Sequence, residues 1–295
     1  MTMPKEQHPN DLRAQPSLRV GGIGAGSIHI CTDGRFQNIN IAAPNPASTA
    51  GGGTPDTFLA LRATTGHGAT VRVLWSTWNR AGANMPSAPA RLRWRCAYPA
   101  AHFQMEDETF PLQAFWTLFS PIIPFDYEAS ALPVFFSSVR LVNQRDEPVD
   151  AALVFNWDGA SAFHGDAHAM RIVTATIKNQ EYPGRFDVQI PKTTEQSGHT
   201  PEQEFNALVF LHEDAESEQI GDHACLAIRH DPMLRLSFVQ WDNRKTSAHE
   251  QFWTYITKGL FSRGLHTQGT FPRCGAIIAE YSLQPREEQR ADFVF

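Results

Sequence analysis

The sequence predicts an all-β protein: a large antiparallel sandwich of two sheets, or supersandwich, with few short helices. At least ten segments rich in β-branched and aromatic residues follow one another at short spacing, separated by turn residues. Only Ser247–Lys258 has a pattern that suits a helix, of about two or three turns. The 295 residues, 42% of them hydrophobic, are enough to bury a large core. No linker divides the chain, so we expect one domain over residues 20–295 after a flexible, proline-containing leader at residues 1–19.

The strongest strand signal lies between Phe119 and Trp157. Three prolines near its start exclude a regular helix there: Pro121, Pro124 and Pro133. The next segment, Val134–Val142, is β-branched and aromatic, and hydrophobic residues occupy every second position from Val149 to Trp157. Side chains alternate between the two faces of a strand, so these segments and the polar turn Gln144–Glu147 predict an antiparallel hairpin with one buried face.

The remaining strands are predicted on both sides of this hairpin. Tight turns at Asp33–Gly34 and Gly66–Gly68 each join two strand-like segments. The strands predicted before the hairpin are Gly21–Ile30, Thr57–Arg62, Thr70–Trp75 and Arg91–Cys96. Those predicted after it are Ile172–Ile177, Ala207–Leu211, Ala224–Arg229, Leu234–Trp241, Cys274–Leu283 and Ala291–Phe295.

Charge and composition exclude several classes of protein. The net charge of −6 and the pI near 6.0 argue against nonspecific nucleic-acid binding, which needs a basic surface. No apolar run is long enough for a transmembrane helix, and the N-terminus has no apolar region of a secretory signal. The four cysteines are widely spaced and form no CxxC pair, which predicts free thiols in a reducing compartment. We therefore expect a cytoplasmic protein.

Two short motifs could indicate a cofactor, and neither does. The spacing Gly22-x-Gly24-x-Gly26 differs from GxGxxG, and no helix pattern follows it to receive a phosphate. His164, Asp166 and His168 lie within five residues, but a catalytic zinc site needs a third convergent ligand, and no second cluster is evident. We predict no cofactor and no metal. Nucleophile-elbow, HExxH and P-loop motifs are also absent from the sequence.

Arginines alternate with apolar residues in Arg91–Cys96. This pattern predicts a strand with a solvated cationic face, and the alternative is a face that binds an acidic ligand or partner.

Several longer segments resemble a known family. They are GGIGAGSIHICTDGRFQN at Gly21–Asn38, the stretch Tyr98–Asn143 that includes FSPIIP at Phe119–Pro124, ALVFNW at Ala152–Trp157, and the tail Leu283–Phe295. Together they resemble the N-terminal domain of glycoside hydrolase family 116, which includes the nonlysosomal glucosylceramidases, or bile acid β-glucosidases. The resemblance extends from about residue 20 to residue 295.

The resemblance implies a two-sheet sandwich that packs against a helical (α/α)6 barrel. In the family, the nucleophilic Glu and the acid/base Asp lie in that barrel and hydrolyse β-glucosides with retention. None of these catalytic motifs can be placed on this sequence, so we predict no catalytic residue. We expect a non-catalytic portion that supports a barrel and helps shape its cleft. The proposed contact residues lie in a proline-braced apolar loop: Phe119, Ile122, Ile123, Phe125, Asp126 and Tyr127.

Two other functions are considered. A free-standing carbohydrate-binding module would stack sugars on exposed aromatic residues, with Trp78, Trp116 and Trp241 as candidates. A self-sufficient glycosidase would use Asp126 or the cluster Glu106–Glu108, and it requires two carboxyl groups about 5–10 Å apart in one pocket.

Overall fold

A computed structural model describes most of the chain. The described residues are 16–40, 56–80, 85–159, 170–179, 186–189, 204–212, 223–229, 231, 234–263, 265 and 272–295. They form three antiparallel sheets and two α-helices, α1 (Tyr127–Ser130) and α2 (Thr246–Lys258), with a 3-10 turn at Phe261–Arg263. The all-β fold class is confirmed. No helix within these ranges is long and apolar enough to cross a bilayer.

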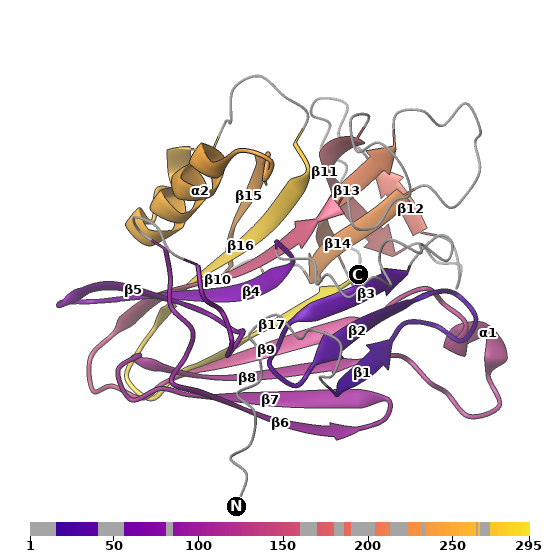
Figure 1. Cartoon of the computed structure of the whole chain (residues 1–295), viewed down its shortest axis with the longest axis horizontal. Coiled ribbons are helices and arrows are strands. Elements are labelled where there is room, and N and C mark those ends of the chain that lie inside the picture. Colours follow the sequence, from indigo (N-terminus) through magenta and orange to yellow (C-terminus); the bar gives the residue numbers. More distant parts are fainter. Residues whose placement is uncertain are drawn as a thin grey trace, which may run out of the picture.

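Two large sheets make up the sandwich, and a small sheet closes one end (Figure 1). The small sheet contains β1 (Ser17–Val20), β2 (Ser27–Cys31) and β3 (Phe36–Asn40). The five-stranded sheet has the order β15 (Arg235–Trp241), β16 (Cys274–Leu283), β10 (Val149–Asp158), β4 (Phe58–Thr65) and β5 (Gly68–Val73). The nine-stranded sheet has the order β12 (Phe186–Gln189), β11 (Met170–Asn179), β13 (Glu204–His212), β14 (His223–Arg229), β17 (Glu288–Val294), β9 (Phe136–Asn143), β8 (Leu112–Phe119), β7 (Ala100–Glu106) and β6 (Arg91–Ala97).

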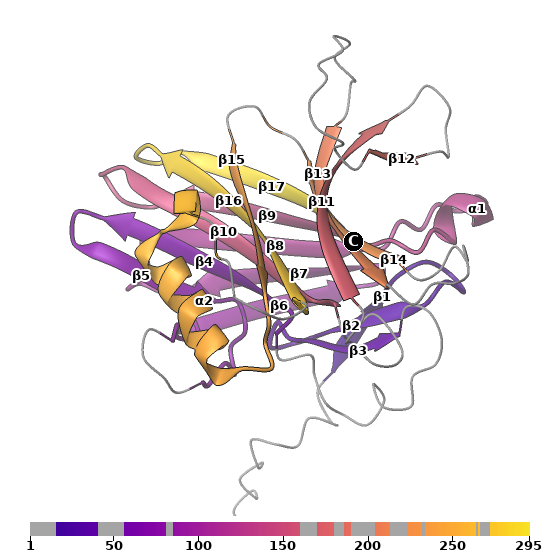
Figure 2. The ribbon, with the colours of Figure 1, turned by 90° about the horizontal axis from the view of Figure 1, so that it is seen from above.

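The apolar side chains form two cores on opposite faces of the five-stranded sheet. The larger core lies between the two large sheets and includes Phe155 and Trp157 of β10. The smaller core includes Val154 of the same strand and packs against Phe252 and Trp253 of α2. Figure 2 shows α2 lying across the five-stranded sheet, on the side away from the nine-stranded sheet. The alternation of β10 therefore supplies both cores.

The small sheet closes the larger core through Phe36. The ring of Phe36 lies 5.8 Å from Trp116 of the nine-stranded sheet and 5.9 Å from Phe155 of the five-stranded sheet. Its position follows from the predicted turn at Asp33–Gly34, where Gly34 has a φ of 88° and β2 pairs with β3. The turn at Gly66–Gly68 is also confirmed, because β4 pairs with β5 across it.

The predicted central hairpin is wrong. β9 pairs with β8 and β17 in the nine-stranded sheet, whereas β10 pairs with β4 and β16 in the five-stranded sheet. The turn between them therefore crosses from one sheet to the other. The buried face of β9 meets one of the two buried faces of β10 across the larger core. A period of two and a short turn suit this arrangement as well as they suit a hairpin.

A second crossing lies beside the first and joins β16 to β17. Asn143, fully buried at the end of β9, connects the two crossings. Its Nδ2 donates to the carbonyl oxygens of Glu147 at 2.8 Å, Leu283 at 3.1 Å and Gln284 at 3.0 Å. Its Oδ1 accepts a hydrogen bond from the Arg145 backbone N–H at 2.9 Å. One amide side chain thus holds together both connections between the sheets.

Two other expectations met different outcomes. The predicted helix Ser247–Lys258 corresponds to α2, which ends at Gly259 in a left-handed conformation, as is common for helix C-termini. The sequence places residues 17–19 in the leader, but in the structure they belong to β1, which pairs with β2. The leader residues 1–15 lie outside the described part of the chain.

Candidate functional site

Exposed large hydrophobic side chains gather at the end of the molecule where α1 lies (Figure 1). They come from the β1–β2 loop, the β6–β7 turn and the β8–β9 connection. Within the described ranges they are Ile23, Tyr98, Ile123, Phe125, Tyr127 and Leu132. We call this set the apolar end face. Scattered exposed apolar residues are normal for a domain surface, whereas these six lie in three adjoining loops.

Hydrogen bonds fix the three loops against one another. The backbone N–H of Gly21 donates to Ser120 Oγ at 2.7 Å, and the Ser120 N–H donates to the Pro99 carbonyl at 3.2 Å. The Ile23 N–H donates to the Ser130 carbonyl at 2.9 Å, which ties the β1–β2 loop to α1. Because these bonds join the loops directly, the apolar end face has a defined shape.

Gly22 allows the closest approach between two of these loops. A Cβ atom at this position would lie 2.1 Å from the backbone carbonyl oxygen of Leu132. Only glycine leaves room for this contact, because backbone atoms cannot move aside as a flexible side chain can. The glycine-rich segment therefore serves close packing against the β8–β9 connection.

The β8–β9 connection is braced from within. Asp126 caps α1, since its Oδ1 accepts a hydrogen bond from the Ala129 N–H at 2.9 Å. The buried Ser130 hydroxyl accepts from the Ile123 N–H at 2.9 Å and donates to the Ile123 carbonyl at 3.2 Å. These bonds hold a segment whose apolar side chains point outward.

Phe125 is the most exposed of these residues. Its side chain is 95% exposed, and its backbone has a φ of 68°. Bulky residues rarely adopt this left-handed conformation, which costs free energy and persists where the surroundings enforce it.

The other predicted contact residues divide into two groups. Ile123, Asp126 and Tyr127 are exposed, whereas Phe119 and Ile122 are half-buried. Phe119 stacks on Phe136 with ring centroids 5.1 Å apart, where β8 and β9 lie side by side. The loop that the sequence singled out therefore presents its side chains to solvent. Its role as a docking surface stays a prediction.

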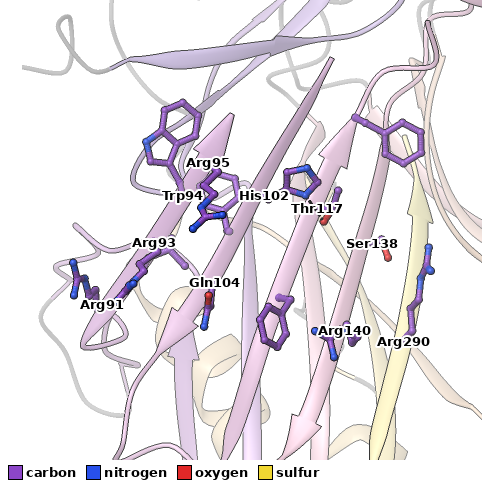
Figure 3. Close-up of a pocket in the computed structure, with 14 residues that line it drawn as sticks. Arg91, Arg93, Trp94, Arg95, His102, Gln104, Thr117, Ser138, Arg140 and Arg290 are labelled. Carbon is purple, nitrogen blue, oxygen red and sulfur yellow. Dashed lines mark hydrogen bonds between the residues drawn. The ribbon is translucent and has the colours of Figure 1, made fainter. Parts of the chain in front are cut away.

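A second surface, which we call the arginine groove, lies on the outer face of the nine-stranded sheet (Figure 3). It has a volume of about 900 Å³ and runs across β6, β7, β8, β9 and β17. Five arginines line it: Arg91, Arg93, Arg95, Arg140 and Arg290. The sequence indicated the three arginines of β6, and all three are exposed there as predicted. It missed the other two, because they reach this face only through the pairing of distant strands.

Residues 17–295 match the family described as "beta-glucosidase 2, glycosyl-hydrolase family 116 N-term". The chain belongs to this family. The resemblance noted in the sequence is thereby confirmed over nearly the whole length. No curated protein sequence matches the chain.

This family 116 N-terminal domain is also similar to solved structures at low sequence identity. A galactose mutarotase related enzyme from Lactobacillus acidophilus is 8% identical, with a TM-score of 0.42, and 95% of this chain and 96% of that chain are covered. A GH36 α-galactosidase from Geobacillus stearothermophilus is 11% identical, with a TM-score of 0.33 and coverages of 95% and 40%. A polysaccharide lyase is 10% identical, with a TM-score of 0.32 and coverages of 96% and 32%. The chain thus spans less than half of the last two proteins.

The tryptophans proposed for sugar stacking lie in the cores of this family 116 domain. Trp116 and Trp241 are fully buried, and Trp78 is 6% exposed. Trp116 faces the larger core, whereas Trp78 and Trp241 pack in the smaller core with α2. Their burial corrects the expectation, because none of the three rings offers a free face to a sugar.

The carboxylates considered for catalysis lie at opposite ends of the sheet. Glu106 ends β7, whereas Asp126 follows the far end of β8. Six residue steps of β8 separate these ends, a distance of about 20 Å at 3.4 Å per residue. The two groups cannot form a glycosidase pair, for which separations of about 5–10 Å are needed.

Asp107 and Asp126 each have a structural role instead. Asp107 accepts a hydrogen bond from Arg72 Nε at 2.7 Å and from the Thr109 hydroxyl at 2.6 Å. Partial burial acts to raise the pKa of Asp107, but the hydrogen bonds from Thr109 and Arg72 outweigh it and lower the pKa. Asp126 is occupied as the cap of α1.

Metal and thiol chemistry find little support in the described residues. His164, Asp166 and His168 lie outside them, and elsewhere no three potential metal-binding side chains come together. All four cysteines are free. Burial raises the pKa of Cys225 to about 12 and, together with the nearby Asp158 and Asp56, raises that of Cys274.

Proposed function

We propose that this chain is the non-catalytic sandwich portion of a β-glucosidase of the glucosylceramidase type, and that it supports an (α/α)6 catalytic barrel. The apolar end face would dock onto the barrel and help form the wall of its substrate cleft. Membership of family 116 supports the link to glycoside hydrolysis. The finer assignment to a β-glucosidase and its barrel is part of the proposal.

The exposure of Phe125 carries the proposal. A single large side chain that is 95% exposed on a strained backbone would lose most of its accessible area in a docked complex. Tyr127, 80% exposed, lies on the adjoining turn of α1. Interfaces typically contain a few aromatic residues of this kind surrounded by smaller contacts.

The distribution of carboxylates is consistent with a catalytic centre outside this domain. Asp126 lies about 20 Å from the cluster Glu106–Glu108, and both Asp107 and Asp126 already hold structural hydrogen bonds. The chain alone is therefore expected to leave an aryl β-glucoside unhydrolysed.

A reconstitution experiment tests the proposal. The purified chain is mixed with a separately produced (α/α)6 barrel of the same family, and both association and hydrolysis of an aryl β-glucoside are measured. We expect association, and activity higher than that of either component. Hydrolysis by the chain alone, or no association at micromolar concentrations, would overturn the proposal.

Matched variants locate the contact. Phe125→Asp places a charge in the apolar end face and should weaken association by at least about tenfold, the effect of losing a central interface residue. His67→Asp places the same charge at the exposed β4–β5 turn, and should leave association unchanged. Equal effects of both substitutions would contradict docking through the apolar end face.

The cytoplasm is the proposed compartment. The support is that all four cysteines are free thiols, which suits a reducing environment.

A further inference from the structure

We propose that the arginine groove binds an acidic oligosaccharide, with uronate carboxylates on its arginines and sugar rings on its aromatic and hydroxyl side chains. This site differs from the apolar end face and does not depend on a barrel partner. The argument comes from the strand register, which arranges the outer face in rows.

The first row combines cations with an aromatic ring. The pairing of β6, β7, β8, β9 and β17 places its members side by side: Arg93, Gln104, Phe115, Arg140 and Arg290. At about 4.8 Å between strands, the row is about 19 Å long. The groove therefore suits an extended chain of several sugar units that runs across the strands.

The second row carries polar groups that donate and accept hydrogen bonds. It contains Arg95, His102, Thr117, Ser138 and Asp292. The His102 ring nitrogen Nδ1 lies 3.0 Å from the Thr117 hydroxyl. Hydroxyl and imidazole groups in a row match the hydroxyl groups that a sugar chain presents, because each group can serve as donor or acceptor.

The groove has more positive charge than its neighbours neutralise. Glu106 pairs with Arg93 at 2.7 Å and lies 3.9 Å from Arg91, and Glu288 pairs with Arg140 at 2.8 Å. Asp292 pairs with Arg290 at 2.7 Å. Three carboxylates thus face the five arginines that line the groove.

Arg95 has no ion-pair partner among the described residues. It lies beside His102 at the edge of the groove. The ion pairs of the other arginines are solvent-exposed and individually weak, so a ligand carboxylate can compete with them. A guanidinium group binds a carboxylate through two parallel hydrogen bonds, which makes an anionic ligand the best match for this surface.

Aromatic rings supply the third element of recognition. The Arg140 guanidinium lies 4.1 Å from the centre of the Phe115 ring, which keeps this cation over the groove. Phe119 and Phe136 form a half-buried stacked pair on the same two strands, four residues from Phe115 and Arg140. Alternating cations, hydroxyl groups and ring faces favour an acidic sugar over an acidic peptide, which offers carboxylates without vicinal hydroxyl groups.

Calorimetry with the full chain tests this inference. The probes are tetragalacturonate, neutral cellotetraose, and tetraglutamate as an acidic peptide without sugar hydroxyl groups. We expect tetragalacturonate to bind at low salt, with an affinity that falls as salt is added, and about tenfold more tightly than tetraglutamate. Cellotetraose should bind more weakly than both.

Two substitutions separate charge from sugar recognition. Arg95→Ala should weaken tetragalacturonate binding about tenfold, the loss expected for one charge-assisted contact. Thr117→Val keeps the shape and β-branching of the side chain but removes the hydroxyl. It should weaken the binding of tetragalacturonate and leave the binding of tetraglutamate unchanged. Arg286→Ala removes an equal charge from an exposed pair with Asp146, outside the residues that line the groove, and serves as control.

Several outcomes would overturn the inference. These are no binding of tetragalacturonate at low salt, equal binding of tetraglutamate with no effect of Thr117→Val, or equal losses with Arg95→Ala and Arg286→Ala. Equal binding of tetraglutamate would instead identify a cationic face that binds anions without specificity, or a face that binds an acidic peptide. Loss of barrel association would leave this inference standing, because the apolar end face and the groove are probed by different variants.

Discussion

Replacing Asn143 by alanine should destabilise the domain strongly, although the residue belongs to neither candidate surface. The side chain is fully buried and is the shared hydrogen-bonding partner of the two crossings between the sheets. Alanine removes the amide and leaves the carbonyl groups of Leu283 and Gln284 without their donor.

The magnitude follows from the bonds that are lost. The amide nitrogen has two hydrogens, which it shares among three carbonyl oxygens, and the amide oxygen accepts one bond from Arg145. Three effective hydrogen bonds at about 1 kcal/mol each give a loss of about 3 kcal/mol in the free energy of unfolding. This is a large part of the total stability of a typical domain.

Urea unfolding followed by circular dichroism and tryptophan fluorescence measures this loss. Asn143→Asp has nearly the same shape but cannot donate when ionised, so it should lose more stability than Asn143→Ala at neutral pH. The variant should regain stability as the pH is lowered, because the protonated carboxyl donates one bond and its folded-state pKa is raised above the unfolded value. Ser138→Ala, half-exposed on β9, is the control and should change stability by less than about 0.5 kcal/mol. A loss below about 1 kcal/mol for Asn143→Ala, at an unchanged slope in urea, would refute the proposed clamp.

Three further predictions concern single side chains. Phe125→Asn should stabilise the isolated chain by up to about 1 kcal/mol, because asparagine tolerates a positive φ, yet weaken association with a barrel; thermal unfolding and binding assays check both signs. Asp107→Asn should destabilise the domain at neutral pH, and the difference from the wild type should shrink as the pH falls below about 4, since the lowered pKa stabilises only the ionised, folded form; urea unfolding as a function of pH measures this. In the native protein, the exposed Cys96 should react with a maleimide quickly while the buried Cys31 and Cys274 react only after unfolding, as mass spectrometry would show.

The sequence predicted the fold class because the period of two survives in almost every strand. It also predicted α2 to within one residue and the turn at Asp33–Gly34. It could not predict that β9 and β10 belong to different sheets. The alternation of apolar and polar residues along a strand shows which of its faces is buried. Its pairing depends instead on which distant strand lies beside it.

For the candidate surfaces too, the sequence predicted local features but not those that depend on the backbone conformation or on distant strands. The proline-braced loop was recognisable as a rigid apolar segment, but the outward position of Phe125 depends on a backbone conformation that its residue type disfavours. The arginine groove needs Arg95, Arg140 and Arg290 on one face of the same sheet, although they are far apart in the sequence. The burial of Trp116 and Trp241 could not be distinguished from exposure, because tryptophan is common in cores and at binding surfaces.

The two cores have a consequence for how the molecule comes apart. β10 places Phe155 and Trp157 in one core and Val154 in the other, so detaching α2 would expose the reverse side of the strand on which the sandwich is built. The two layers are therefore thermodynamically linked and should melt as one cooperative unit. Since Trp157 lies in one core and Trp253 in the other, the emission of tryptophans in both layers should change at the same urea concentration.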